Sequence, residues 1–148
     1  MRLSTRAQYA VRAMVDLSLY SNGSPVSLKE IADREDISLN YLEQLFFRLK
    51  KGNIVTSVRG PGGGYLLARE SSSIKLGEIV TLVEDRLAPL ACMEMTKQGC
   101  HKETVCVTHN VWTLLAEKIR GFLDSITLED LTHEARQRMT PAESLGGG

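Results

Sequence analysis

Residues 27 to 51 hold two short helical patterns separated by a turn, and this arrangement constrains the fold more than any other feature. Ser27 and Glu30 form a capping box, which predicts a helix that runs from here to about Arg34. A turn of about three residues follows, as is usual between two such helices, and Ser38 is the expected N-cap of the next helix. The apolar face of that helix is Leu42, Leu45, Phe46 and Leu49. The sequence therefore predicts a helix-turn-helix, a motif that places its second helix in the major groove of DNA.

The outer face of this second helix carries side chains that suit DNA contact. Asn and Gln can pair with adenine, Arg with guanine, and Lys with phosphate. The candidates on the helix and at its start are Ser38, Asn40, Tyr41, Glu43, Gln44, Arg48 and Lys51. Glu43 is unusual, because DNA phosphate repels a carboxylate unless that carboxylate accepts a hydrogen bond from a cytosine amino group. We therefore expect Glu43 to weaken binding to wrong DNA sites. An ordinary solvated helix face is an equally good interpretation of each residue taken alone.

A β-hairpin is predicted directly after this helix. Two β-rich runs, residues 54–58 and 65–68, flank the sequence Arg59-Gly60-Pro61-Gly62-Gly63-Gly64. A hairpin in this position is a wing, and we expect Arg59 and Gly60 at its tip to contact DNA, with Arg59 in a minor groove. A phosphate-binding glycine loop is one alternative, but the sequence lacks the Gly-Lys-Ser/Thr ending and a following helix. A purely structural turn is the other alternative.

Apolar periodicity predicts further helices before and after this unit. They are expected from residue 4 or 5 to about 20, from about 76 to 84, and from a cap at Thr108 to about 126. The apolar stripe of the last, long helix is Val111, Leu115, Ile119, Phe122 and Ile126. This surface has no obvious partner within the chain, so we expect a two-fold homodimer through this helix, with full burial in one protomer as the alternative.

Charge is distributed unevenly along a chain whose formal net charge is zero. Residues 1–69 carry ten Lys or Arg against six Asp or Glu, whereas residues 70–148 carry eight against twelve. A basic first half favours a nucleic-acid partner, and the acidic second half should stay away from phosphates. No apolar run reaches the ~18 residues of a membrane span, and no secretory signal is recognisable, so we expect a cytoplasmic protein with no membrane partner.

The three cysteines fall within one stretch that also holds two of the three histidines. Cys92, Cys100, Cys106 and His109 have the spacing C-x7-C-x5-C-x2-H, and the odd number of cysteines excludes a complete set of intrachain disulfides. Such a cluster in a cytoplasmic chain indicates metal binding. Only Cys106 and His109 are as close as zinc ligands usually are, whereas the wide gaps suit a two-iron cluster. Spacing alone leaves both zinc and iron–sulfur open.

Two other interpretations of the cysteines have less support. Three buried structural cysteines would need apolar neighbours, and residues 93–105 are mostly polar. A metalloenzyme would need an open coordination position with an acid or base beside it, and no motif such as His-Glu-x-x-His is present. We therefore expect a protein that is not an enzyme.

Several motifs together resemble a known family. They are Met1-Arg2-Leu3-Ser4, Tyr9-Ala10-Val11, Ile37-Ser38-Leu39-Asn40-Tyr41-Leu42-Glu43-Gln44-Leu45-Phe46, Val58-Arg59-Gly60-Pro61-Gly62-Gly63-Gly64-Tyr65-Leu66-Leu67, and the three cysteines followed by Thr108-His109 and Trp112. Over residues 1–131 the chain resembles the IscR-like branch of winged-helix transcription regulators that carry iron–sulfur clusters. The wing motif is specific to the wider family, and the cysteines with His109 narrow the resemblance to this branch.

The patterns and the resemblance together predict a mainly α fold with a small β-hairpin wing. We expect a winged helix-turn-helix DNA-binding domain over residues 1–70, a cluster-binding loop and dimerisation helix over 71–131, and a disordered tail over 132–148. The resemblance implies a homodimer that binds a double-stranded DNA operator and controls iron–sulfur assembly genes. It also implies one [2Fe–2S] cluster per subunit, supplied by the iron–sulfur assembly machinery and ligated by Cys92, Cys100, Cys106 and His109.

The chain departs from typical members at one place. Seven residues separate Cys92 from Cys100, where typical members have five, which bears on the geometry of the cluster. A nitric-oxide- or redox-sensing repressor of the same fold is the second interpretation. Its members take an acidic ligand near the start of the first helix, where this chain reads Thr5-Arg6-Ala7-Gln8.

Overall fold

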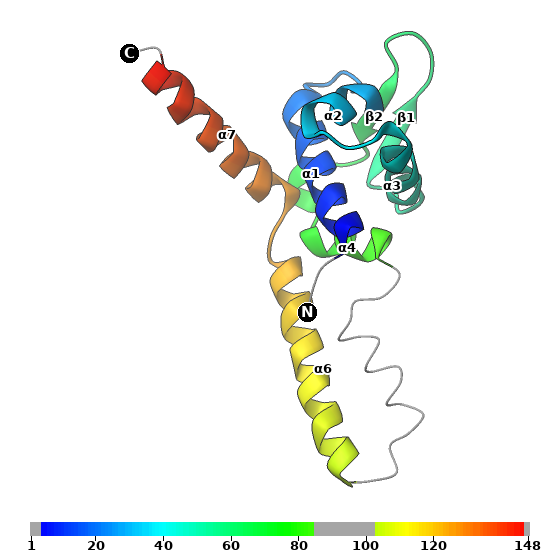
Figure 1. Cartoon of the computed structure of the whole chain (residues 1–148), viewed down its shortest axis with the longest axis vertical. Coiled ribbons are helices and arrows are strands. Elements are labelled where there is room, and N and C mark those ends of the chain that lie inside the picture. The colour runs from blue at the N-terminus through cyan, green and yellow to red at the C-terminus, as the bar shows by residue number, and fades with distance from the viewer. Residues whose placement is uncertain (1–3, 85–102, 147–148) are drawn as a thin grey trace.

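The computed structural model describes residues 4–84 and 103–146, with side chains for 4–84 and 107–139 (Figure 1). Within these residues the protein is mainly helical and has one two-stranded antiparallel hairpin. In chain order the elements are α1 (Thr5–Tyr20), α2 (Leu28–Glu35), α3 (Leu39–Lys51), β1 (Val55–Val58), β2 (Gly64–Leu67), the 3-10 helix η1 (Ser71–Ser73), α4 (Leu76–Val83), α6 (Glu103–Asp124) and α7 (Leu128–Gly146). The predicted fold class, a helical protein with a hairpin wing, is confirmed.

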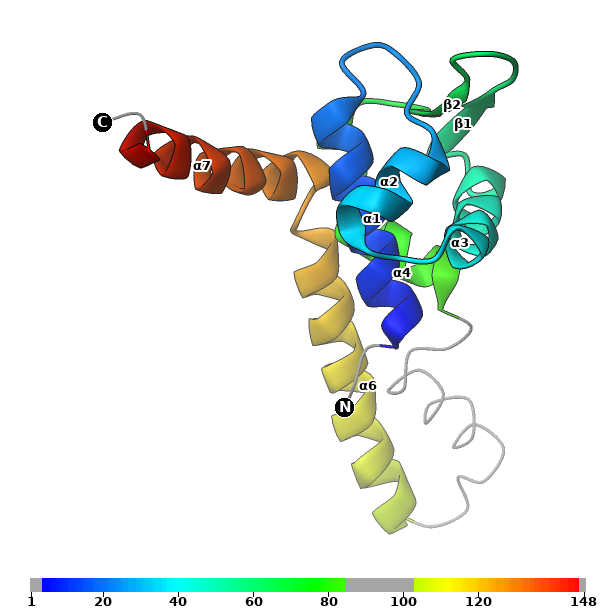
Figure 2. The same ribbon diagram turned by 45° about the horizontal axis from the view of Figure 1, so that its top comes forward.

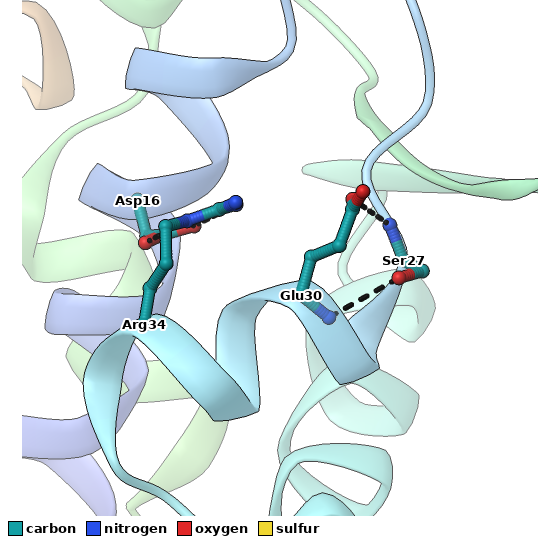
Figure 3. A network of polar contacts seen from close by, with 4 residues as sticks. All are labelled: Asp16, Ser27, Glu30 and Arg34. Atoms are coloured by element: carbon teal, nitrogen blue, oxygen red, sulfur yellow. Dashed lines mark hydrogen bonds and ion pairs between the residues drawn. The ribbon is translucent and has the colours of Figure 1, made fainter.

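Serine side chains begin the first three helices, at the positions that the sequence predicted. Ser4 and Ser38 each accept a hydrogen bond from the backbone N–H three residues later, at 3.3 Å and 3.2 Å. Ser27 and Glu30 form the complete capping box at the start of α2 (Figure 3). Each cap satisfies a backbone N–H that the helix leaves without a partner and contributes about 1 kcal/mol.

The core forms around α1, which contacts α2, α3, α4, α7 and β2. Three alanines on its inner face, Ala7, Ala10 and Ala13, are buried, and their small side chains let the neighbouring helices approach closely. The apolar stripe predicted on α3 is also buried, and it consists of Leu42, Leu45, Phe46 and Leu49. Burial of that stripe fixes which face of α3 points outward, because the two faces of an amphipathic helix lie opposite each other.

The turn between α2 and α3 is short and contains one residue in the left-handed conformation. Asp36 has φ 55° and ψ 50°, and its N–H donates to the carbonyl of Ala32. Aspartate tolerates this conformation better than most residues. Ile37 follows and is buried, which anchors the turn to the core. α2 and α3 therefore form the predicted helix-turn-helix.

The hairpin lies beside α3 and forms the predicted wing (Figure 2). Its base is attached to the core through Tyr65, whose backbone exchanges hydrogen bonds of 2.8 and 3.0 Å with Val26. The Tyr65 ring also meets the ring of Phe46 on α3, with 4.9 Å between centroids. The register pairs Val55 with Leu67, Thr56 with Leu66, Ser57 with Tyr65 and Val58 with Gly64.

The helices α1, α2, α3 and α4 form a body, from which α6 and α7 extend in two different directions (Figure 1). α6 begins at Glu103, so the prediction that Thr108 caps this helix was wrong, and Thr108 lies inside it. Glutamate is a favourable residue type in a first helical turn because of the helix dipole, and Glu103 occupies that position in α6. No helix in the described ranges is both long and apolar enough to cross a membrane.

α7 continues as helix to Gly146, whereas the sequence predicted a disordered tail over residues 132–148. Its start is capped, since Thr127 and Asp130 exchange hydrogen bonds of 2.9 and 3.1 Å. Thr132 is buried, and its hydroxyl donates to the carbonyl of Leu128 at 2.7 Å and is hydrogen-bonded to the hydroxyl of Ser18 on α1 at 3.0 Å. Packing on α1 thus stabilises the first turns of α7, because tertiary contacts override weak propensity.

An ion pair with a buried carboxylate joins α1 to α2 (Figure 3). The Asp16 side chain is 1% exposed, and Arg34 donates to both of its carboxylate oxygens at 2.8 to 3.2 Å. The same guanidinium lies over the ring of Tyr20, 4.0 Å from its centroid. The hydrogen bond from Arg34 to Asp16 raises the pKa of Arg34 above its ordinary value. The first helix of the helix-turn-helix is therefore held to α1 by an ion pair whose carboxylate is buried and whose guanidinium is partly exposed.

Replacing Arg34 by Ala should lower the free energy of unfolding by about 3 kcal/mol, because the buried Asp16 carboxylate would lose its partner. The double variant Asp16→Leu/Arg34→Ala should recover part of this loss, since no buried charge is then left unpaired. Urea unfolding followed by circular dichroism measures both changes. Equal stability of the wild type and the single variant would show that the pair is not a structural link.

Candidate DNA interface and metal centre

The outer face of α3 presents polar side chains to solvent. Four of the residues predicted to contact DNA are exposed there, and they are Asn40, Glu43, Gln44 and Lys51. Ser38 is also exposed at the N-cap. The last turn of α3 is basic and its first turn has no acidic residue. Such a helix can reach base edges with residues near its start and phosphates with residues near its end.

Two other predicted DNA contacts, Tyr41 and Arg48, are half-buried and make contacts within the protein. The ring of Tyr41 meets the ring of Tyr9 edge to face, with 5.7 Å between centroids. Arg48 Nη1 donates to the main-chain carbonyl of Val83, the last residue of α4, at 3.1 Å. Helical periodicity predicts the direction in which a side chain leaves the helix but not which neighbouring element it meets. These two residues hold α3 against α1 and α4.

The wing tip carries Arg59 and Gly60, and both are exposed. Gly60 has φ 99° and Gly62 has φ 74°, a conformation that L side chains rarely adopt, so the tight tip requires glycine. Closer to α3, the Lys50 ammonium donates to the hydroxyl of Ser57 on β1 at 2.8 Å. This hydrogen bond joins the wing to α3. Sequence reasoning had no signal for it, because the two residues belong to different elements.

The four candidate metal ligands fall partly outside the described residues. Cys92 and Cys100 lie in the stretch 85–102, and Cys106 has a described backbone in α6 but no described side chain. His109 is half-buried on α6. Positions 106 and 109 share one face of this helix, since residues three apart are neighbours on a helix surface. Among the described residues, no group of three or more His, Cys, Asp or Glu is arranged so that it could hold a metal ion.

The carboxyl end of α4, directly before that stretch, is tied to two other elements. The Ser4 hydroxyl at the start of α1 donates to a carboxylate oxygen of Glu84. Arg48 of α3 holds the carbonyl of Val83. α4 itself packs against α1, α3 and α6. The end of α4 is therefore a junction between α3, which carries the candidate DNA contacts, and the chain segment that leads to the candidate ligands.

α6 carries large apolar side chains that are left open to solvent in a single chain. Ala116 and Leu123 on its inner side are buried, and Leu115 and Ile119 of the predicted stripe are half-buried. The exposed apolar residues, with exposed fractions of 45 to 64%, are Val107, Val111, Trp112, Leu114 and Phe122. An apolar face of this size is typical of an interface with another chain.

Comparison with known proteins shows what the chain is similar to. The Rrf2 family, described as iron-dependent transcriptional regulator, matches residues 3–134. The HTH-type transcriptional regulator IscR of Serratia proteamaculans is 47% identical over 133 residues, which cover 90% of this chain and 80% of that protein. The HTH-type transcriptional regulator IscR of Yersinia enterocolitica has the same identity and coverage.

Solved structures agree with these sequence relatives. T. potens IscR is similar with a TM-score of 0.74 and 41% identity, over 91% of this chain and 88% of that chain. CymR, the global cysteine regulator of B. subtilis, is similar with a TM-score of 0.75 and 32% identity, over 90% of this chain and 98% of that chain. Both the sequence relatives and these structures are named as regulators, and none of them as an enzyme.

Replacing Gly64 by Ala should detach the base of the wing, because the added Cβ would lie 2.3 Å from the carbonyl oxygen of Val26. We expect the free energy of unfolding to fall by about 2 kcal/mol, as for other overpacked sites. Gly121→Ala in α6 is the matched control, since nothing lies within 4 Å of a Cβ there and alanine favours helix. Urea unfolding of both variants is the measurement, and unchanged stability of Gly64→Ala would contradict the close approach.

Proposed function

The chain belongs to the Rrf2 family of transcriptional regulators and is of the IscR type, and from this we propose that it binds operator DNA as a homodimer, senses iron–sulfur status through a [2Fe–2S] cluster and controls genes for iron–sulfur cluster assembly. One observation carries the proposal: the exposed polar face of α3 lies beside a wing with an exposed arginine at its tip. A helix in the major groove and an arginine in the adjacent minor groove together read one half-site.

In this proposal, each exposed residue of α3 makes the kind of DNA contact that its side-chain chemistry allows. Asn40 and Gln44 pair with base edges, adenine being the base that suits an amide. Glu43 accepts a hydrogen bond from a cytosine amino group and repels phosphate at sites that lack one. Lys51 contacts phosphate near the end of the helix, and Ser38 contacts phosphate or base at its start.

The wing and the half-buried residues have separate roles. Arg59 enters the minor groove, and Gly60 beside it lets the backbone approach the DNA without a side chain in the way. Tyr41 and Arg48 act as positioning residues, since their contacts with Tyr9 and Val83 hold α3 in place. The Lys50–Ser57 hydrogen bond supports the proposal because it keeps helix and wing at a fixed separation.

The chemistry of the donor set fits a [2Fe–2S] cluster. Three thiolates and one imidazole can supply two ligands to each of two irons. Cys106 and His109 would hold it from α6, and Cys92 and Cys100 from the stretch before α6. When bound, the cluster supplies a site whose occupancy depends on iron and sulfide. His109 makes that occupancy labile, because an imidazole donates less electron density than a thiolate and can be protonated.

Ligation of this kind would affect α3 through the end of α4. Cys92 and Cys100 belong to the stretch between Glu84 and α6, and the cluster would link them to the ligands on α6. Ligation would therefore affect the position of the residues at the end of α4, directly before this stretch. Val83 is the neighbouring residue, and its carbonyl is the acceptor for Arg48 of α3. A ligand shifts the equilibrium between two conformations of a protein only if it binds one of them more tightly than the other. We propose that forms with and without the cluster hold α3 differently and therefore prefer different operators.

The exposed face of α6 supports the homodimer. Two copies that bury Val111, Leu114 and Phe122 against each other would remove these side chains from water. A two-fold arrangement also presents two copies of α3 and the wing to two half-sites of a palindromic operator.

Replacing Gln44 by Ala should weaken binding to selected operator DNA by about 1–3 kcal/mol and relax sequence preference at one base pair. Replacing Lys51 by Ala should weaken binding to all sequences and reduce the salt slope by about 1. Arg138→Ala on α7, whose side chain is 80% exposed, is the matched control. Fluorescence anisotropy at several salt concentrations measures the three variants. If Arg138→Ala weakens binding as much as the α3 variants do, DNA does not bind at α3.

Protein purified without air should absorb visible light and contain about two irons and two sulfides per chain, as a [2Fe–2S] cluster requires. Cys92→Ala should lose the absorption while keeping the circular dichroism of the helices, because the substitution removes a proposed ligand of the cluster. Absorption spectra with iron and zinc analysis are the measurements. Colourless protein that contains zinc would contradict the cluster and favour a zinc site.

Replacing Leu114 by Glu should raise the dimer dissociation constant by about a hundredfold or more, because each copy would bury an unpaired carboxylate. Sedimentation equilibrium measures the change. Met139→Glu is the matched control, since Met139 is an exposed apolar residue on α7. A dimer that survives Leu114→Glu unchanged does not form through this face of α6.

A further inference from the structure

α3 carries one large apolar side chain on its otherwise polar outer face. Phe47 is 59% exposed, whereas its neighbour Phe46 is fully buried against the core. Phe47 lies three residues after Gln44 and four before Lys51, so the three side chains share one face of the helix. Packing of the core does not require this phenylalanine. Covering this ring in a complex would stabilise the complex by removing apolar surface from water.

The surroundings of Phe47 are cationic. The Lys51 ammonium lies 4.8 Å from the centroid of the Phe47 ring. Phe47 and Lys51 also line a shallow depression together with Leu82 of α4. A ring with a cation held over it, on a helix that ends in basic residues, suits an anionic partner more than an apolar protein surface. The α6 face proposed for the dimer is a different set of side chains on a different helix.

The major groove of DNA offers one apolar group to such a ring. A phenyl group cannot hydrogen-bond with base edges, but it can pack against the C5-methyl group of thymine. Lys51 would lie beside the same ring and reach the phosphate backbone. We propose that Phe47 is a specificity-determining residue that selects a thymine in each half-site by contact with its methyl group. This inference rests on the proposed DNA binding by α3.

The test uses the full-length protein and DNA that this protein itself selects from a random pool. Each thymine of the selected half-site is replaced, one at a time, by uracil, which keeps the base pair and removes only the methyl group. At one position uracil should weaken binding of the wild type by about fourfold, the size expected for burial of one methyl-sized group. Phe47→Ala should bind the thymine and uracil versions of that position equally.

Two controls accompany this cycle. Phe47→Leu should keep part of the preference for thymine, because leucine can still contact the methyl group. Met139→Ala removes an exposed apolar side chain from α7 and should leave the whole uracil scan unchanged. Circular dichroism checks that each variant is folded.

The outcomes separate this inference from the proposed function. If the wild type selects no DNA, the proposed function fails and this inference fails with it. If the wild type binds selected DNA but its uracil scan equals that of Phe47→Ala at every position, the thymine contact is absent while DNA binding stands. If Phe47→Ala weakens binding to thymine and uracil versions by the same factor, Phe47 contributes to affinity without reading the methyl group, which also overturns the inference.

Discussion

A hydrogen bond from the Arg48 guanidinium of α3 to the main-chain carbonyl of Val83 ties the helix that carries the candidate DNA contacts to the end of α4. The last carbonyls of a helix have no partner within the helix, so this contact supplies one and fixes the position of α3 at the same time. The Ser4 hydroxyl holds the next residue, Glu84, from the start of α1. The end of α4 is therefore defined by α1 and α3 together, directly before the stretch that holds Cys92 and Cys100.

The orientation of the candidate DNA face follows from burial on the opposite side of the same helix. The apolar stripe of α3, which runs from Leu42 to Leu49, is fully buried in the core. The opposite face, which carries Asn40, Gln44 and Lys51, therefore points to solvent. The wing is positioned by contacts at its base, where Tyr65 meets Val26 and Phe46. Helix and wing thus form one continuous surface, and Lys50 adds a direct hydrogen bond between them through Ser57. Preorganisation of this kind reduces the entropy that binding must overcome.

The sequence predicted correctly those helix starts and turns that depend only on residues close to one another in the chain. The caps at Ser27 and Ser38 and the glycine-rich wing act over three or four residues, so a reader of the sequence can find them. Contacts between distant elements could not be predicted, because periodicity gives a direction without a neighbour. Arg48 illustrates the limit: periodicity placed it near the outer face of α3, but nothing in the sequence indicated its hydrogen bond to Val83. α7 shows the same limit, since its first turns pack against α1, a contact that the sequence pattern did not indicate. The metal ligands stay a prediction, because most of them lie outside the described residues.

The central claim is that cluster ligation and DNA preference are linked through the end of α4. The most direct measurement is DNA selection from one random pool by protein with a reconstituted cluster and by cluster-free protein in parallel, followed by the affinity of each form for both sets of selected sites. The account predicts that at least one set of sites distinguishes the two forms by about tenfold, which corresponds to about 1.4 kcal/mol of coupling. Equal affinity of both forms for every selected site, with cluster occupancy verified by absorption and iron content, would contradict it.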